Sequence, residues 1–123
     1  MIPRILIVDN ATEVVAALVE FFELKTDWLV RTTGDGAEAW EMLQRFRFDL
    51  VQVEYLLSFA IGINGLELCC LIKRHIPGTK VVFASSWITQ DEAFAFGADV
   101  HFTKPFQLVD YLVILKKLLG LHS

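Results

Sequence analysis

Five short apolar segments alternate with longer amphipathic segments along this chain. They lie at residues 4–8, 28–32, 48–53, 80–84 and 100–103, and each ends at polar residues. Short, nearly continuous apolar runs rich in valine, isoleucine and leucine are typical of strands buried on both faces. Such strands occur in parallel sheets, whose neighbouring strands need crossover connections. The alternation therefore predicts an α/β fold built on an open, doubly wound parallel sheet.

The intervening segments predict helices from residue 10 or 11 to about 24, then at 37–45, 65–75, 90–96 and 107–119. Apolar residues recur there three and four positions apart, as on the buried face of a helix. Pro77 and Gly78 are stop signals after the third helix, and Pro105 suits the start of the last. We expect the fourth helix to be short or irregular.

Length and charge exclude several classes of protein. A chain of 123 residues is long enough for one domain, which we expect to span residues 1–123. The net charge is -4 and no basic stripe is present, so direct binding to nucleic acid is not expected. No apolar run approaches the roughly 20 residues of a membrane span. Adjacent Cys69 and Cys70 are poorly placed to bridge each other and are expected to be buried thiols of a cytoplasmic protein.

Apolar residues make up 54% of the chain, more than is usual for a small soluble domain. Either the core is large or some apolar surface is kept for a partner. The last helix illustrates both explanations. Its predicted buried stripe contains Leu108, Leu112, Leu115 and Leu119, while Tyr111 lies to the side of this stripe. A deeper groove within the domain and a docking surface would each account for so broad an apolar face.

Polar and charged residues follow four of the predicted strands. Asp9 and Asn10, Glu54, Ser85 and Lys104 come at or just after these strand ends. In open α/β sheets, ligands bind at the carboxyl ends of the strands. Two carboxylates suit Mg²⁺, and a hydroxyl and an ammonium suit an anion such as an acyl phosphate. Ordinary helix capping is the alternative explanation for Asp9 and Asn10.

Six segments of the chain resemble motifs of one protein family. They are RILIVDN, TTGDGAEAWEML, FDLVQVE, NGLELC, VVFASS and GADVHFTKPF. These resemble the receiver domain of bacterial response regulators, the phosphate-accepting module of two-component signalling, from Ile5 to about Leu119. The resemblance implies a flavodoxin-like sheet with strand order 2-1-3-4-5. It also implies a cytoplasmic signal-transduction module that is not an enzyme.

The resemblance assigns roles to single residues. Asp9 falls at a metal-site acid, Asn10 at the position of the usual second acid, and Glu54 at the phosphoacceptor position. Ser85 falls at the switch hydroxyl, Lys104 at the phosphate-binding lysine, and His101 at the aromatic-switch position. Glu54, Asn10 and His101 depart from the family's pattern.

These departures predict an atypical member of the family. The extra methylene of Glu54 would move its carboxylate toward Lys104, where it would imitate a phosphoryl oxygen and be misplaced for attack on a phosphodonor. Asn10 removes one negative charge from the metal site, so Mg²⁺ binding should be weak, and no other cofactor is expected. The predicted function is therefore a phosphorylation-independent receiver that acts through protein–protein contacts.

The expected partners are a histidine kinase, an output domain or another signalling protein. Trp87, Phe94, Phe96 and Tyr111 are the candidate residues of the partner face. A homodimer could form through the face made by the fourth helix, fifth strand and fifth helix. One alternative is a working Mg²⁺-dependent phosphoacceptor. Another is a small doubly wound ligand-binding or enzymatic domain, against which the first loop VDNATEV counts because it lacks a glycine-rich phosphate loop.

Overall fold

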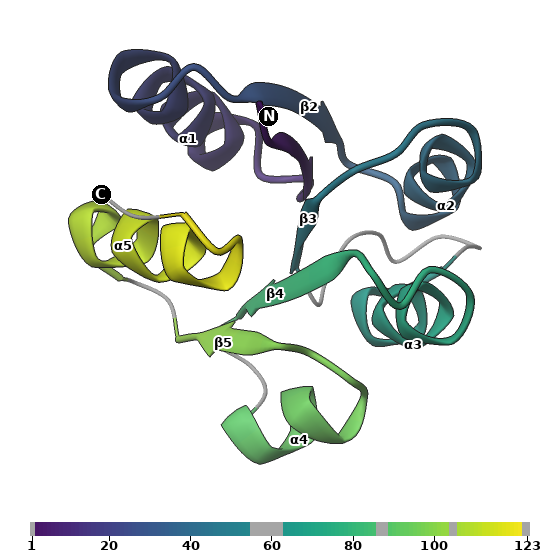
Figure 1. The fold of residues 1–123 in the computed structure, drawn as a ribbon. Helices are drawn as coiled ribbons and strands as arrows, with labels where there is room; N and C mark the ends of the chain where they lie inside the picture. Colours follow the sequence, from purple (N-terminus) through teal and green to yellow (C-terminus); the bar gives the residue numbers. More distant parts are fainter. Residues whose placement is uncertain (1, 55–62, 86–88, 104–105, 122–123) are drawn as a thin grey trace.

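A five-stranded parallel sheet with helices on both faces forms the fold (Figure 1). The computed structural model describes residues 2–54, 63–85, 89–103 and 106–121. The strands are β1 (Arg4–Val8), β2 (Leu29–Thr33), β3 (Leu50–Glu54), β4 (Lys80–Ala84) and β5 (Val100–Phe102). The helices are α1 (Thr12–Lys25), α2 (Gly36–Arg45), α3 (Gly65–His75), α4 (Gln90–Ala95) and α5 (Leu108–Leu118).

The strand order is β2-β1-β3-β4-β5, as predicted. The strands at the centre are the most deeply buried, and every residue of β3 is buried. Because each strand is short and covered on both faces, near-continuous apolar sequence was the correct signal for a parallel sheet. Among the described helices, none is both long and apolar enough to cross a membrane.

The sheet separates two hydrophobic layers. Helices α1 and α5 cover one face, and α2 and α3 cover the other (Figure 1). Strand side chains alternate between these layers, as the pleat requires: Ile5 and Ile7 belong to the α1–α5 layer, and Leu6 and Val8 to the α2–α3 layer. Helix α4 adds Ala93 to the α2–α3 layer.

Capping boxes define the starts of α3 and α4. In α3, the Asn64 side chain accepts a hydrogen bond from the Glu67 N–H, and the Glu67 side chain accepts one from the Asn64 N–H. Thr89 and Glu92 do the same for α4. Thr89 caps the start of α4, and Gly97, at a positive φ of 100°, follows its end. The helix therefore has only six residues, which confirms the prediction of a short fourth helix.

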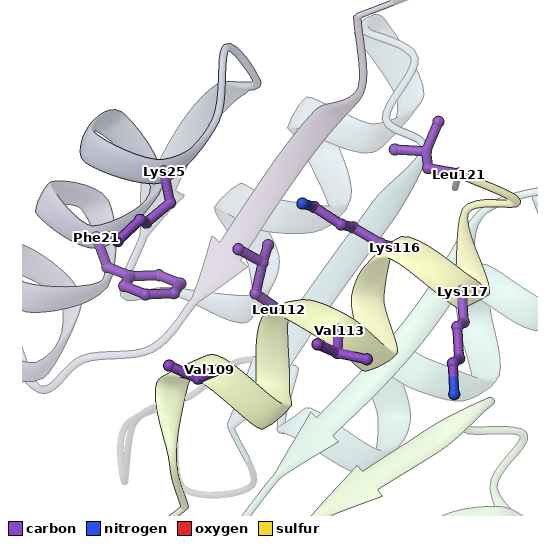
Figure 2. Close-up of a pocket in the computed structure, with 8 residues that line it drawn as sticks. All are labelled: Phe21, Lys25, Val109, Leu112, Val113, Lys116, Lys117 and Leu121. Atoms are coloured by element: carbon purple, nitrogen blue, oxygen red, sulfur yellow. The ribbon is translucent and has the colours of Figure 1, made fainter. Parts of the chain in front are cut away.

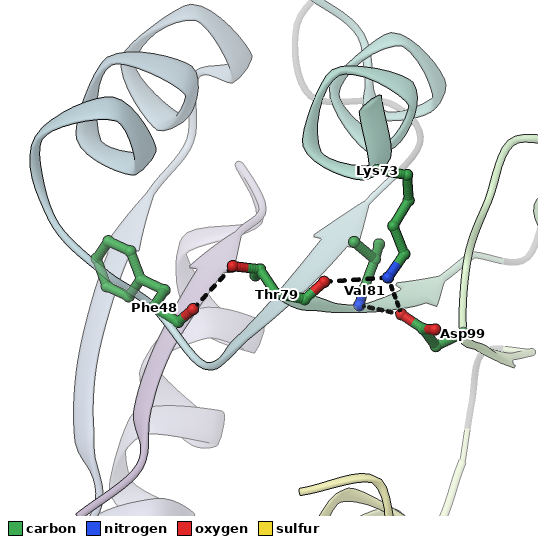
Figure 3. A network of polar contacts seen from close by, with 5 residues as sticks. All are labelled: Phe48, Lys73, Thr79, Val81 and Asp99. Atoms are coloured by element: carbon green, nitrogen blue, oxygen red, sulfur yellow. Dashed lines mark hydrogen bonds and ion pairs between the residues drawn. The ribbon is translucent and has the colours of Figure 1, made fainter. Parts of the chain in front are cut away.

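A polar network ties α3 to the amino ends of the central strands (Figure 3). The Lys73 ammonium lies 2.6 Å from Asp99 Oδ2 and donates to the Thr79 carbonyl at 3.1 Å. The same Asp99 oxygen accepts from the Val81 N–H at 2.8 Å. The Thr79 hydroxyl then donates to the Phe48 carbonyl at 2.9 Å, which extends the network to the residues before β3.

One prediction about the two cysteines is wrong. Cys69 is buried, and burial raises the pKa of its thiol to about 12. Cys70 is exposed, with its thiol directed at the Phe96 carbonyl at 3.7 Å. Adjacent residues on a helix point about 100° apart, so only one of the pair can face the core.

Candidate functional site

Three predicted site residues lie buried where the central strands end. Asp9 follows β1, Glu54 ends β3 and Ser85 follows β4. The register pairs Val8 with Val53, so Asp9 and Glu54 come next on neighbouring strands, which in a sheet lie roughly 4.8 Å apart. Glu54 in turn pairs with Ala84, the residue before Ser85. The parallel sheet thus brings together side chains that are far apart in the sequence.

Asp9 is held by the backbone on two sides. Its N–H donates to the Thr33 carbonyl at 3.0 Å, and its Oδ1 accepts from the Ala11 N–H at 2.8 Å. Ala11 occupies the N-cap of α1 and makes no side-chain cap, so the Asp9 carboxylate supplies an acceptor at this helix start. Gly34 allows the close packing here, since a Cβ at that position would lie 3.3 Å from Asn10 Cα.

The far side of the site is formed by β4 and β5. The Ser85 N–H donates to the Phe102 carbonyl at 3.1 Å, and Ser85 is fully buried. His101 lies on β5, paired with Phe83. Its Nε2 is buried without a hydrogen-bond partner among the described residues, and burial lowers the pKa of its imidazole. Lys104, predicted to bind phosphate, lies outside the described residues.

The strand-end residues meet only some of the requirements of a Mg²⁺ site. Asp9 and Glu54 offer carboxylate oxygens, the ligands that Mg²⁺ prefers, and Asn10 is the next residue along the chain. Within the residues that the structure describes, no group of three or more histidine, cysteine, aspartate or glutamate side chains is arranged to hold a metal ion. Two buried carboxylates on adjacent strands fit the charge of such an ion but offer few ligands for it.

Comparison with known proteins identifies the family. The family profile described as "Response regulator receiver domain" matches residues 5–116. The chain belongs to the response regulator receiver domain family. The family is a signalling module of two-component systems, as the motifs predicted.

Curated relatives support the same assignment. The response regulator RppA of Synechocystis sp. is 28% identical over 120 residues, which cover 94% of this chain and 50% of that protein. The transcription factor prr1 of Schizosaccharomyces pombe is 29% identical over 118 residues, covering 94% of this chain and 21% of its own length. The chain therefore spans half or less of these relatives.

Solved structures show the same fold. A CheY-like receiver domain protein of Methanospirillum hungatei JF-1 superposes with a TM-score of 0.88 at 23% identity, covering 98% of this chain and 95% of that one. The receiver domain of the TMAO respiratory system response regulator TorR gives 0.84 at 26% identity, with 96% and 97% covered.

Two residues of the predicted partner face are exposed. Phe94 on α4 is 42% exposed and Phe96, which follows the helix, is 39% exposed. Trp87 lies outside the described residues. The first turn of the same helix contains Asp91 and Glu92.

Tyr111 was wrongly assigned to the partner face. Its side chain is fully buried between α5 and the sheet, against the rings of Phe22, Phe102 and Phe106. Its hydroxyl donates to Gln52 Oε1, and burial raises the pKa of the phenol. The sequence did carry a signal for this contact: Gln52 is a polar residue within a strand predicted to be buried, so it required a polar partner.

Proposed function

We propose that this chain is a receiver module whose output does not depend on phosphorylation. In this proposal it acts by binding other signalling proteins in the cytoplasm. Membership of the receiver family supplies the signalling role. The substituted residues at the strand ends support independence from phosphorylation.

The observation that carries the proposal is the position of Glu54. It is the last residue of β3, only 8% exposed, and it pairs with Ala84 directly before Ser85. This is the strand end at which the family's phosphoacceptor aspartate is expected. A glutamate there carries its charge one methylene farther from the backbone, so the carboxylate takes the place of a phosphoryl oxygen rather than of the attacking one.

Asn10 supports the same proposal. A carboxamide at the second acid position leaves Asp9 and Glu54 as the acids of the described site, and Asp9 Oδ1 already accepts the Ala11 N–H. A weaker metal site reduces phosphoryl transfer, because Mg²⁺ normally neutralises the charge that develops on the transferred group.

The α4 face supports a protein partner. Phe94 and Phe96 are exposed aromatic residues at the end of a helix whose first turn contains Asp91 and Glu92. Aromatic residues are enriched at protein interfaces relative to the rest of the surface. A histidine kinase, an output domain and another signalling protein all remain within this proposal.

Binding of a phosphoryl mimic, monitored by NMR, tests this proposal. We expect beryllofluoride with Mg²⁺ to leave the ¹H–¹⁵N spectrum of the wild-type protein unchanged. The double variant Asn10→Asp/Glu54→Asp, which restores both acids, should show saturable shifts near residues 9, 54 and 85. Glu67→Asp, a matched change at the exposed α3 cap, should behave as the wild type does.

A second measurement separates the alternative. Acetyl phosphate with Mg²⁺ should give no mass increase on the wild-type protein. A saturable beryllofluoride shift in the wild type, or a labile phosphoryl adduct on Glu54, would instead establish a working phosphoacceptor and refute the proposal.

A further inference from the structure

A cavity lies between the edge strand β2 and the carboxyl end of α2. Its volume is about 290 Å³. Three arginines line it together with apolar side chains: Arg4, Arg31 and Arg47, with Leu29, Met42 and Phe46. Arg4 begins β1, whereas Asp9 follows that strand. The cavity therefore lies toward the opposite end of the sheet from the candidate functional site.

Strand pairing places two of these arginines on the same side of the sheet. Arg4 pairs with Leu29 across β1 and β2. Two positions along, Leu6 pairs with Arg31, and Leu6 belongs to the core beneath α2 and α3. Residues two apart on a strand face the same side of a sheet, as do residues paired across parallel strands. Arg4, Leu29 and Arg31 therefore all face the α2 side, where the three side chains are exposed.

The cavity has more positive than negative charge. Arg47 Nη2 lies 3.8 Å from Asp49 Oδ1, so this arginine has a carboxylate partner. Within the described parts of the chain, the side chains of Arg4 and Arg31 make no ion pair. No aspartate or glutamate is among the residues that line the cavity. Two guanidinium groups are therefore left for an anion from outside.

Acidic residues on the flanking elements do not balance this charge. Asp27 precedes β2 and Glu38 lies in the first turn of α2, and neither pairs with an arginine of the cavity. Glu41 already pairs with Arg45 at 3.1 Å. The carboxyl end of α2 carries a partial negative charge, which Arg45 in its last turn offsets.

The lining suits a ligand with two chemically different parts. Phe46 is 58% exposed and Leu29 is 49% exposed, so both offer apolar surface to a bound molecule. The planar guanidinium of arginine binds a carboxylate or phosphate through paired hydrogen bonds, and it also stacks on aromatic rings. Ligand pockets usually measure roughly 300–1,000 Å³, so this cavity is at the small end of their range and suits a molecule of one or two rings.

The groove between α1 and α5 does not combine these features (Figure 2). It accounts for part of the broad apolar face predicted for the last helix, and its cationic lining residues are Lys25, Lys116 and Lys117. Lysines lack the planar fork of arginine. Helix α1 also carries the exposed acids Glu20 and Glu23, which disfavour an anion near that helix.

We infer that the cavity between β2 and α2 binds a small aromatic anion, a molecule of one or two rings that bears a carboxylate or phosphate group. The rings contact Leu29 and Phe46, and the acid group is bound by Arg4 and Arg31. This inference goes beyond the proposed function, which concerns Glu54 at the other end of the sheet.

NMR titration of the whole chain with four probes tests the ligand class. Naphthoate and naphthyl phosphate each combine fused rings with an acid group, and both should give saturable shifts at residues 4, 29–31, 42 and 46–48. Naphthalenemethanol has the rings without the charge, and inorganic phosphate has the charge without the rings. Each of these two should bind at least about tenfold more weakly, because each makes only half of the contacts. The acid that binds more tightly identifies the preferred oxyanion.

Substitution of Arg31 tests the site. Arg31→Met keeps much of the apolar side chain and removes the charge, and it should raise the dissociation constant of the tighter acid by about tenfold or more. Arg31→Lys keeps the charge without the planar fork and should restore only part of the affinity. Arg74→Met, a matched change at an exposed arginine on α3, and Lys116→Met in the α1–α5 groove should leave the affinity unchanged. Circular dichroism confirms that each variant is folded.

Three results would overturn the inference. They are a wild-type protein that gives no saturable shift with either acid, shifts confined to the α1–α5 groove or to the strand-end site, and an Arg31→Met variant that binds as tightly as the wild type. None of these bears on whether Glu54 accepts a phosphoryl group, so this inference and the proposed function fail separately.

Discussion

A buried glutamine in the central strand shows how one residue can govern local structure. Gln52 is 1% exposed and lies in the middle of β3, among apolar neighbours. The Tyr111 hydroxyl on α5 donates to its Oε1. A buried acceptor without a donor costs about 1–3 kcal/mol. The hydrogen bond avoids this cost for Gln52, and it also joins α5 to the sheet.

Removing that donor should destabilise the protein. We expect Tyr111→Phe to lower the free energy of unfolding by about 1–3 kcal/mol, because Gln52 Oε1 loses its partner while the ring still fills its site. Urea unfolding measures the change. The double variant Gln52→Leu/Tyr111→Phe should lose less than the sum of the two single variants, and strict additivity would show that the hydrogen bond contributes nothing.

The sequence predicted the strand-end residues but not this contact. Asp9, Glu54 and Ser85 could be placed because each follows an apolar run whose end is visible locally. Tyr111 was misplaced because helical spacing alone selected Leu108, Leu112, Leu115 and Leu119 as the buried stripe. In the structure Tyr111 and Leu115 are the fully buried pair, since the polar side chain of Gln52 faces α5 and favours a hydroxyl there.

At the scale of whole elements, local signals gave accurate boundaries where caps or breakers were present. The predicted bounds of α3 match the structure, because Asn64 caps the start of the helix and Pro77 follows its end. The predicted bounds of β4 match as well. β2 and β3 begin later than predicted, at Leu29 and Leu50. Trp28 packs against the α1–α5 core and Phe48 lies in the α2–α3 core, but neither residue is part of a strand. The apolar segments are therefore longer than the strands that they contain.

The Lys73–Asp99 pair joins α3 to the residue before β5, and the sequence could not predict it because the two residues are 26 positions apart. We expect Lys73→Met to destabilise the protein by about 1–3 kcal/mol, since it leaves a partly buried carboxylate without its cation. Arg45→Met is the control. It breaks the exposed Arg45–Glu41 pair and should cost under about 0.5 kcal/mol, as surface pairs do. Equal losses in urea unfolding would contradict a special role for Lys73.

At the scale of the whole molecule, the sheet divides the protein into two cores that share its strands. Phe102 of β5 belongs to the α1–α5 core, and His101, one residue earlier, lies on the other face of the sheet. Residues at the ends of the strands thus lie between the α1–α5 layer and the α2–α3 layer, which are built from distant parts of the chain. The sequence could show which residues are at these ends, but their burial depends on how both layers close over them.

Proton binding to His101 therefore affects the unfolding equilibrium of the whole chain. Burial lowers the pKa of His101 below its ordinary value of 6.5, and its Nε2 has no hydrogen-bond partner among the described residues. The unfolded chain then binds a proton more readily than the folded one. Stability contributed by neutral His101 is present at higher pH and is lost as the pH falls through 6.5 toward the lower folded-state pKa.

We expect His101→Phe to remove this part of the pH dependence. Between about pH 7.5 and about pH 5, the variant should lose less unfolding free energy than the wild type does, because no imidazole is left to protonate on unfolding. Urea midpoints at both pH values measure the difference. His75→Phe, at an exposed histidine on α3, is the matched change and should keep the wild-type loss. Equal losses in His101→Phe and the wild type would show that His101 binds a proton as readily in the folded protein as in the unfolded chain, so that its burial has no thermodynamic consequence.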